Sequence, residues 1–404
     1  MFDEVIKDVK NIFFLGIGGI GMSALAKFFI REGYKVYGYD RISTGITDNL
    51  IKNGANIIFD DDVSKIDDKK IDMVVYTVAV PDSLNISRYL KKNCNKVYKR
   101  SEILGMLTEK FYTIAIAGSH GKTTVSSIIS HILYESGFDI HCFVGGIMNN
   151  YGTNYIHSNG IKYMGKSILV VEADEFDMTF LQFYPDIEVI TSIDSDHLDI
   201  YGNLKNIEEA FVKFTENLKK EGKIVINDNI NGVKSRIKNN YETYSLSFTS
   251  DNYASDYIFE DNEIIFNYIS KNNRINYIKT TLVGWHNIEN CIAAITVANT
   301  LGVDENVIRE SLNDYRGVRR RFEYIINNDK IVYIDDYAHH PSEIDATLKS
   351  LRKLYNNKKL TGVFQPHLFS RTRDLYVDFA KSLELLDVVI LLDIYPAREE
   401  PIEG

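Results

Sequence analysis

The stretch FYTIAIAGSHGKTT, residues 111–124, joins an apolar run to a short glycine-containing turn that ends in lysine and threonine. The apolar run predicts a buried strand. The residues after the turn predict a helix with one apolar face, formed by Val125, Ile128, Ile129, Ile132 and Leu133. Gly137 stands where a glycine commonly ends such a helix. Strand, turn and helix in this order predict an α/β fold with an anion-binding loop.

The turn has the composition of a phosphate loop. Its residues are Gly118, Ser119, His120, Gly121, Lys122, Thr123 and Thr124. The backbone amides of such a loop surround phosphates, its lysine meets the β- and γ-phosphate oxygens, and its threonine hydroxyl reaches Mg²⁺. The common pattern G-x-x-x-x-G-K-[ST] is not met in full, because Ile116 stands at its first glycine. The loop therefore has a shorter form, and ATP as its ligand needs support from other residues.

Acidic side chains and a histidine follow two later strand-like runs. Glu172 ends the first run, with Asp174 and Glu175 close behind, and Asp196 and His197 end the second. Ligands gather at the carboxyl ends of strands in an open α/β sheet, so we expect these groups to lie near the phosphates. Mg²⁺ prefers carboxylate and water oxygens and accepts an occasional imidazole. The alternative is that the acids cap helices and His197 contacts a neighbour.

A second glycine-rich turn lies near the N-terminus, after the strand-like run NIFFLG (11–16). The pattern G-x-G-x-x-G is formed by Gly16, Gly18, Gly19, Ile20 and Gly21, with Asp40 ending the next strand. Such a turn lets helix amides reach a pyrophosphate, and the acid contacts a ribose. The pyrophosphate could belong to NAD in an oxidoreductase or to a UDP-sugar, and a turn without a ligand is a third reading.

Strands alternate with helices along the whole chain, so we expect parallel sheets and an α/β fold throughout. Its 404 residues are too many for one core and predict two or three domains. We expect a Rossmann-like domain at 1–108, a P-loop ATPase-like domain with a mostly parallel sheet at 109–316, and a second Rossmann-like domain at 317–404. Within the central domain, residues 253–282 alternate like short antiparallel strands.

Composition excludes several classes of protein. The formal net charge of -10 argues against a general binder of nucleic acid or membrane surfaces, which carries a basic field. No apolar run is long enough to span a membrane, and the acidic start MFDEVIKDVK is unlike a signal peptide. The three scattered cysteines fit a reducing cytosol. We therefore expect a cytoplasmic protein; the sequence carries no signal for an oligomeric state.

Together these motifs resemble those of the Mur ligase family. The matching stretches are GIGGIGMSALA, GSHGKTT, VVEADEFDMTFL, SDHLDIYG, GWHNIENCIAA, GVRRRFE, DDYAHHPSE, FQPHLFSRTRDLYVDFA and LLDIYPAREEPIEG. They run from residue 16 to the last residues. The resemblance implies that the first domain holds a UDP-sugar, the central domain binds ATP, and the third domain closes over both. A regulatory nucleotide-binding protein without turnover would not need the arginines and acids of the third domain.

The resemblance also implies a role for individual residues. Lys122 would contact the γ-phosphate, and Mg²⁺ would be held by Thr123, Glu172 and His197. The adenine and nearby nucleotide groups would be met by His286, Asn287 and Asn290. The alternative for these residues is helix capping, which for Asn287 could hold at the same time. From the third domain, Arg321 and Asp336 would contact ATP, and Tyr337 and His339 would lie near the amino acid. Arg371 and Arg373 would contact the reacting carboxylate and phosphate. On composition alone, these arginines could be solvated surface charges.

The implied activity is the ATP-dependent joining of L-alanine to the carboxylate of UDP-N-acetylmuramate, a step of peptidoglycan precursor synthesis. The carboxylate attacks the γ-phosphorus, which gives an acyl phosphate and ADP, and the amine of L-alanine then displaces phosphate. Positioning and charge neutralisation supply most of the catalysis in such a transfer. No nucleophile from the protein is needed.

Departures within the family favour the branch that adds L-alanine. Phe211 stands where several siblings carry a carbamylated lysine, so we expect no such lysine here. No insertion follows EADE, unlike in the branch that attaches a whole tripeptide. Trp285 replaces an arginine usual in the family, which puts an arginine contact near the nucleotide in doubt. Family members continue beyond YPAREEPIEG, so we expect a truncated third domain with an exposed sheet edge.

Overall fold

The first region of the chain forms a parallel sheet with helices on both faces. A computed structural model describes residues 1–66, 70–194, 198–260, 263–396 and 399–402. The strands of this region are β1 (Asn11–Leu15), β2 (Lys35–Tyr39), β3 (Asn56–Ile58), β4 (Met73–Tyr76) and β5 (Val97–Lys99). Its helices are α1 (Phe2–Val5), α2 (Ile20–Arg31), α3 (Gly45–Lys52), α4 (Asn85–Asn93) and α5 (Arg100–Lys110), with a short 3₁₀ turn at Val63–Lys65. The strand order β3-β2-β1-β4-β5 places β2 and β4 on opposite sides of β1. A crevice therefore opens at the carboxyl end of β1, where the first glycine-rich turn lies.

The central region contains a ten-stranded sheet in the order β15-β14-β13-β12-β11-β10-β6-β9-β7-β8. Its strands are β6 (Tyr112–Ala117), β7 (Ile140–Met148), β8 (Thr153–Ser158), β9 (Ile168–Ala173), β10 (Ile187–Ile190), β11 (Lys223–Asn227), β12 (Tyr241–Ser245), β13 (Asn252–Glu260), β14 (Glu263–Ser270) and β15 (Arg274–Thr280). Its helices are α6 (Lys122–Glu135), α7 (Leu198–Tyr201), α8 (Leu204–Thr215), α9 (Asn231–Lys234), α10 (Trp285–Thr300) and α11 (Glu305–Asp314), with a 3₁₀ segment at Phe176–Gln182.

Most neighbours in the central sheet are parallel, as the sequence predicts. The antiparallel pairs β13–β14 and β14–β15 confirm the alternation at residues 253–282. The antiparallel pair β7–β8 at the other edge was not predicted. Since β9 and β10 flank β6 on opposite sides, the sheet has its switch point at the carboxyl end of β6.

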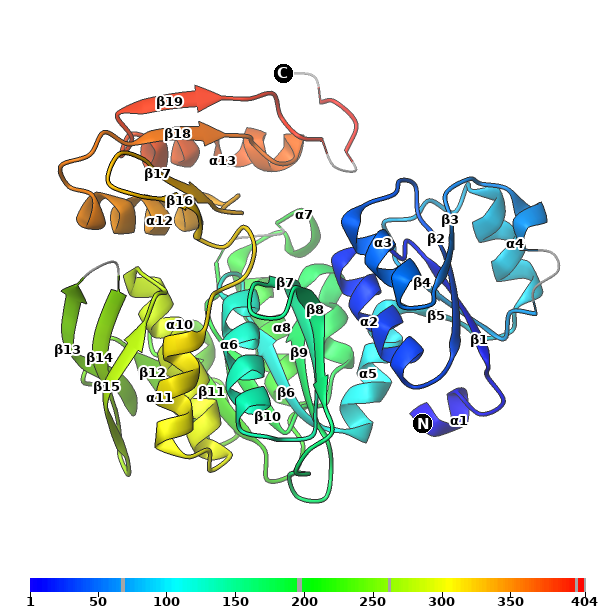
Figure 1. Cartoon of the computed structure of the whole chain (residues 1–404), viewed down its shortest axis with the longest axis horizontal. Coiled ribbons are helices and arrows are strands. Elements are labelled where there is room, and N and C mark those ends of the chain that lie inside the picture. The colour runs from blue at the N-terminus through cyan, green and yellow to red at the C-terminus, as the bar shows by residue number, and fades with distance from the viewer. Residues whose placement is uncertain (67–69, 195–197, 261–262, 397–398, 403–404) are drawn as a thin grey trace.

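The third region lies over one end of the central region (Figure 1). It contains β16 (Glu323–Asn327), β17 (Val332–Asp335), α12 (Pro341–Leu354), β18 (Thr361–Phe364), α13 (Phe369–Leu383) and β19 (Val388–Leu391). Strands β18 and β19 are parallel, but β16 and β17 form a separate antiparallel hairpin. The expectation of strands alternating with helices throughout is wrong for this hairpin, because only four residues, 328–331, separate the two strands and none of them is helical.

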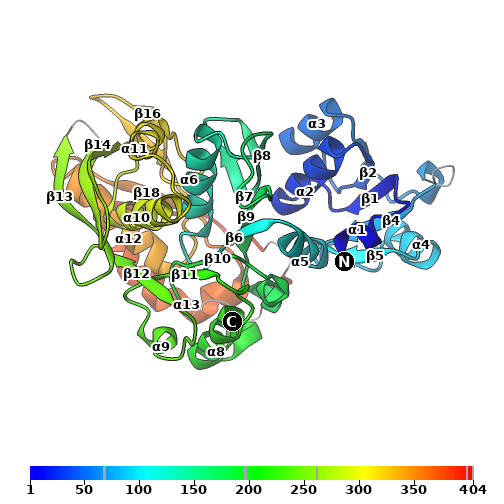
Figure 2. The ribbon, with the colours of Figure 1, turned by 90° about the horizontal axis from the view of Figure 1, so that it is seen from below.

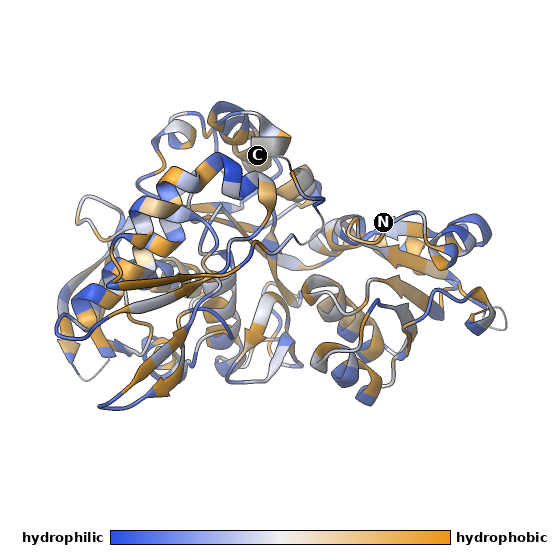
Figure 3. Ribbon diagram, turned by 90° about the horizontal axis from the view of Figure 1, so that it is seen from above, coloured by the Kyte–Doolittle hydropathy of each residue, from blue (hydrophilic) through white to orange (hydrophobic). Residues whose placement is uncertain are grey.

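The apolar residues form clusters of very different extent. One cluster is continuous between the first and central regions. In it the ring centre of Phe28 of α2 lies 5.9 Å from that of Phe143 of β7 and 6.4 Å from that of Tyr155 of β8. The third region has a small cluster of its own, made of Ile344, Leu348, Phe364 and Phe379. Figure 2 shows α2 against β7 and β8, and Figure 3 shows hydrophobic residues concentrated in the strands. The first two regions are therefore firmly joined.

Candidate active site

The phosphate loop lies between β6 and α6, at the switch point of the central sheet. Two glycines have left-handed backbone angles, with φ of 136° at Gly118 and 83° at Gly121. A Cβ atom on Gly118 would lie 2.2 Å from Thr191 Oγ1, and one on Gly121 would lie 2.8 Å from Asn290 Oδ1. Both positions therefore require glycine. The strand, turn and helix predicted from the sequence are confirmed.

Lys122, the first residue of α6, is held by a carboxylate. Its ammonium donates to Glu175 Oε2 at 2.7 Å and to the carbonyl of Gly118. Burial opposes the charge of Lys122, but Glu175, Asp174 and Glu172 outweigh this effect and hold the pKa of Lys122 above its usual value. Glu175 is itself 2% exposed. The lysine is therefore positively charged and directed toward the loop.

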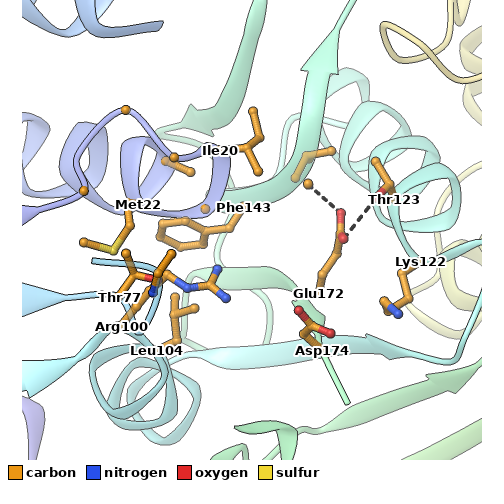
Figure 4. A pocket seen from close by; sticks show the side chains of 18 of the residues that line it. Ile20, Met22, Thr77, Arg100, Leu104, Lys122, Thr123, Phe143, Glu172 and Asp174 are labelled. Atoms are coloured by element: carbon orange, nitrogen blue, oxygen red, sulfur yellow. Dashed lines mark hydrogen bonds between the residues drawn. The ribbon is translucent and has the colours of Figure 1, made fainter. Parts of the chain in front are cut away.

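Glu172 joins the end of β9 to the first turn of α6. Its carboxylate accepts a hydrogen bond from Thr123 Oγ1 at 3.1 Å (Figure 4). It also accepts hydrogen bonds from Ser126 Oγ at 3.0 Å and from the amide of Gly145 at 2.5 Å. Thr123 and Glu172 thus lie together, as predicted for two metal ligands. His197 and Asp196 lie outside the residues that the structure describes. Among the described residues, no three His, Cys, Asp or Glu side chains are grouped to hold a metal ion.

A cavity of about 1260 Å³ reaches from the first glycine-rich turn to the phosphate loop. Its lining includes the six residues predicted for the UDP-sugar, namely Gly16, Gly18, Gly19, Ile20, Gly21 and Asp40. It also includes Ser119 to Thr124 of the phosphate loop, and Glu172. Asp40 already accepts a hydrogen bond from the Gly18 amide at 2.7 Å. One carboxyl oxygen of Asp40 therefore holds the turn.

Arg100, the first residue of α5, was not identified from the sequence. Figure 4 shows Arg100 on one side of this cavity and Lys122 on the other, with the carboxylates of Glu172 and Asp174 between them. Its guanidinium lies so close to Gly21 that a Cβ there would be 2.1 Å from Nη1. A single arginine at a helix start carries no motif, so only the fold reveals that it faces the glycine-rich turn.

A second cavity, of about 230 Å³, lies between the central and third regions. It is lined by His286, Asn287, Asn290, Arg321 and Asp336, together with His120, Gly121 and Thr124 of the phosphate loop. Burial lowers the pKa of His286 to about 4, so its ring is neutral. Gly284 is the N-cap residue of α10, and Asn287 Nδ2 donates to the carbonyl of Val283. The alternative that Asn287 caps this helix is therefore wrong.

Arg321 and Asp336 lie near the start of the third region. Asp336 accepts backbone hydrogen bonds from Phe322 at 2.9 Å and Ala338 at 2.7 Å. Burial raises the pKa of Asp336 to about 6, although these bonds and Arg321 oppose the shift. The guanidinium of Arg321 lies 5.2 Å from the ring centre of Tyr337. Both residues line the second cavity, as predicted for a pair that reaches ATP.

Some predicted residues are not brought to these cavities. His339 lines the larger cavity, but the linings of both leave out Gly118, Tyr337, Arg371 and Arg373. Arg373 lies on the surface of α13, with its Nε 2.7 Å from Asp374 Oδ1. In this arrangement Arg373 is a solvated surface charge, which is the alternative that composition suggested.

The strand, glycine turn and helix from Tyr112 to Glu135 have the arrangement of a P-loop protein, and one cavity joins this loop to the first glycine-rich turn. Sequence models match the chain in three parts: "Mur ligase family, catalytic domain" at residues 11–112, "Mur ligase middle domain" at 116–298, and "Mur ligase, glutamate ligase domain" at 320–403. The chain belongs to the Mur ligase family. None of the helices in the described residues has the length and apolar character needed to cross a membrane.

Named relatives share most of the chain. A UDP-N-acetylmuramate–L-alanine ligase of Phocaeicola vulgatus is 44% identical over 404 residues, which are 99% of this chain and 87% of the relative. One of Flavobacterium johnsoniae is 43% identical with the same coverage. The crystal structure of the UDP-N-acetylmuramate–alanine ligase of Thermotoga maritima superposes with a TM-score of 0.80 at 29% identity, covering 96% of this chain and 86% of that one. The predicted α/β fold and the predicted family are confirmed.

Proposed function

We propose that this protein joins L-alanine to UDP-N-acetylmuramate at the expense of ATP, in peptidoglycan precursor synthesis. The observation that carries the proposal is the single cavity shared by the turn at Gly16–Gly21 and the loop at Gly118–Thr124. A sugar nucleotide bound at the first turn can place its carboxylate next to the γ-phosphate of ATP bound at the second. The relatives of 40% identity and above carry this activity in their names. An NAD-linked oxidoreductase would leave the phosphate loop without a role.

The proposed reaction has two steps. The sugar carboxylate attacks the γ-phosphorus with ADP leaving, and the amine of L-alanine then attacks the acyl carbon with phosphate leaving. Lys122 neutralises charge on the transferred phosphoryl group, and the amides of the loop orient it. Arg321 and Asp336 complete the nucleotide site from the third region. The second step takes place beside Tyr337 and His339, with Arg371 and Arg373 near the reacting groups only after a rearrangement of α13.

Mg²⁺ belongs to the proposal as the ion that accompanies ATP. Thr123 and Glu172 offer the oxygen atoms that Mg²⁺ prefers, and they lie 3.1 Å apart at the edge of the loop. Mg²⁺ commonly takes its remaining ligands from water and phosphate, so one carboxylate and one hydroxyl suit it. When bound, the ion would reduce the negative charge of the phosphates. His197 remains a proposed third ligand.

The division of the chain is proposed on the same grounds. We retain 1–108 for the UDP-sugar, 109–316 for ATP, and 317–404 for the amino acid and the closing contacts with ATP. A cytoplasmic location fits the three buried, unpaired cysteines, Cys94, Cys142 and Cys291, because thiols persist in reducing compartments.

The test is mass spectrometry of UDP-N-acetylmuramate incubated with ATP, Mg²⁺ and one amine substrate at a time. L-Alanine, glycine, L-serine and the preassembled tripeptide should be compared, with release of phosphate measured in parallel. We expect the mass of the L-alanine adduct and one phosphate per adduct. A tripeptide adduct without an L-alanine adduct would refute the proposed substrate. No adduct with any amine would refute the activity.

A further inference from the structure

Glu343, in the first turn of α12, uses its two carboxyl oxygens for two different contacts. Oε2 accepts backbone hydrogen bonds from His339 at 2.9 Å and His340 at 3.3 Å. Oε1 lies 3.0 Å from Nδ1 of His120, which belongs to the phosphate loop. One partly buried carboxylate therefore connects the segment that carries Tyr337 and His339 directly to the loop that carries Lys122.

His120 is in turn fixed from several sides. Its Nε2 lies 2.9 Å from Asp194 Oδ2 and 2.9 Å from Ser342 Oγ, and its backbone amide donates to Ser192 Oγ at 2.8 Å. The imidazole rings of His120 and His340 have centres 5.1 Å apart. These contacts come from the central and third regions alike, so the ring of His120 lies at the junction between them.

The charges of the pair favour the contact. Burial opposes the charged imidazole, but hydrogen bonds to Asp194 and Glu343 outweigh it and raise the pKa of His120 to about 9. Burial also opposes ionisation of Glu343, but His120, His339 and Arg321 hold its pKa well below the usual range. The groups facing the pair are Asp194, His286, Asp336, His339, His340 and Arg321. A charged pair of this kind forms stronger hydrogen bonds than a neutral one.

We propose that Glu343 is a positioning residue that sets the amino-acid segment at residues 337–340 in register with the phosphate loop through His120. The inference rests on the proposed function and adds to it the contact through which the two halves of the site are aligned. Attack by the amine requires the acyl phosphate, held by the loop, and the amine, held by the third region, to meet within a few tenths of an ångström, and a rigid two-sided carboxylate provides that alignment.

Glu343→Gln tests this role without unfolding α12. Glutamine can replace glutamate in the reciprocal capping of a helix start, so the bonds from His339 and His340 persist. The amide nitrogen would then face Nδ1–H of His120, two donors with no acceptor between them. Asp345→Asn is the matched control, because Asp345 is a carboxylate of the same helix whose ion pair, with Lys349 at 2.6 Å, lies within α12.

We expect Glu343→Gln to raise the KM for L-alanine about tenfold or more, the usual effect of losing a charged hydrogen bond. The affinity for UDP-N-acetylmuramate should stay within about twofold. Acyl phosphate formation without L-alanine, trapped by hydroxylamine as the hydroxamate, should fall less than ligation does. Asp345→Asn should match the wild type in all three measurements. Emission of Trp285, the single tryptophan of the chain, reports whether the fold is retained, because its ring lies 4.0 Å from Lys353 of α12.

Variants of His120 test whether His120 and Glu343 act through their contact with each other rather than independently. His120→Leu should raise the KM for L-alanine as Glu343→Gln does, and the double variant should be no worse than either single one. His120→Asn keeps a donor near the place of Nδ1 but cannot titrate. The KM of His120→Asn for L-alanine, divided by that of the wild type, should change as pH rises through about 9, because only the wild type loses an imidazole proton there.

The inference is overturned if Glu343→Gln keeps the wild-type KM for L-alanine, if it slows acyl phosphate formation as much as ligation, or if the losses of the single variants multiply in the double variant. Failure of the proposed function looks different, because the wild-type protein would then give neither the hydroxamate nor the L-alanine adduct.

Discussion

Glu188 of β10 is a carboxyl group buried without a partner, and its replacement should stabilise the protein. The side chain is 0% exposed, and neither oxygen has a hydrogen-bond partner among the residues that the structure describes. Its neighbours in register are the apolar Ala115 of β6 and Ile224 of β11. Burial therefore raises the pKa of Glu188 well above its usual 4.5.

The size of the effect follows from these surroundings. A buried polar group without a partner costs about 1–3 kcal/mol. Glu188→Met removes the polar oxygens at similar volume, so it should gain most of that cost. For a unit of roughly 200 residues, the gain corresponds to a rise of about 2–4 °C in Tm per kcal/mol.

The gain should depend on pH. Above pH 4.5 the unfolded carboxyl loses its proton while the folded one keeps it, so the unfolded state binds fewer protons and stability falls as pH rises. The fall is up to about 1.4 kcal/mol per pH unit until the folded group also ionises. Glu188→Gln, which cannot ionise, should lack this dependence but keep the unpaired polar group.

The assay is urea unfolding followed by the emission of Trp285 at pH 5, 6 and 7, with wild type, Glu188→Met and Glu188→Gln compared. The advantage of Glu188→Met should grow between pH 5 and pH 7. At pH 5 Glu188→Gln should differ from the wild type less than it does at pH 7. If Glu188→Met is no more stable at pH 7, or if the difference between wild type and Glu188→Gln is the same at pH 5 and pH 7, the reasoning fails.

Three further predictions concern the proposed site. Lys122→Ala should lower turnover more than about a hundredfold while calorimetry shows UDP-sugar binding within about twofold, and a variant that keeps a tenth of the rate would contradict the loop assignment. Glu172→Ala and His197→Ala should each raise the Mg²⁺ concentration needed for half-maximal activity, with Mn²⁺ as an effective substitute; identical metal titrations would remove both from the ligand set. Asp40→Asn should weaken UDP-sugar binding several-fold, because the Gly18 amide then loses a charged acceptor, and unchanged affinity would show that the turn holds its shape without it.

The sequence predicts well the elements in which local pattern and global fold agree. The strand, loop and helix from Tyr112 to Glu135 are one such case, because each is defined by neighbours in the chain. The pair β7–β8 was missed, because an antiparallel edge depends on which strand lies beside it rather than on periodicity. The hairpin β16–β17 was read as part of a strand–helix series for the same reason.

In the site, glycine turns and the carboxylate of Glu172 follow from motifs. The hydrogen bond between Lys122 and Glu175 does not follow from a motif, because it depends on the distance between the ends of β6 and β9. The contacts of Arg100 and Glu343 could not be predicted from the sequence either, since each reaches a segment more than seventy residues away in the chain. Contacts across such separations are set by the packing of whole elements, which a pattern of single residues does not contain.

The continuous apolar cluster between the first and central regions sets the distance between these regions before any substrate binds. Lys27 of α2 adds to it by donating to Thr153 at 2.9 Å and Asn154 at 2.8 Å on β8. These contacts hold the first glycine-rich turn at a set distance from the phosphate loop. Under the proposed function, a sugar nucleotide whose carboxylate lies too near to or too far from its pyrophosphate would bind at the first turn and still miss the γ-phosphate. Selection among sugar nucleotides would then appear in the rate of phosphoryl transfer rather than in binding affinity.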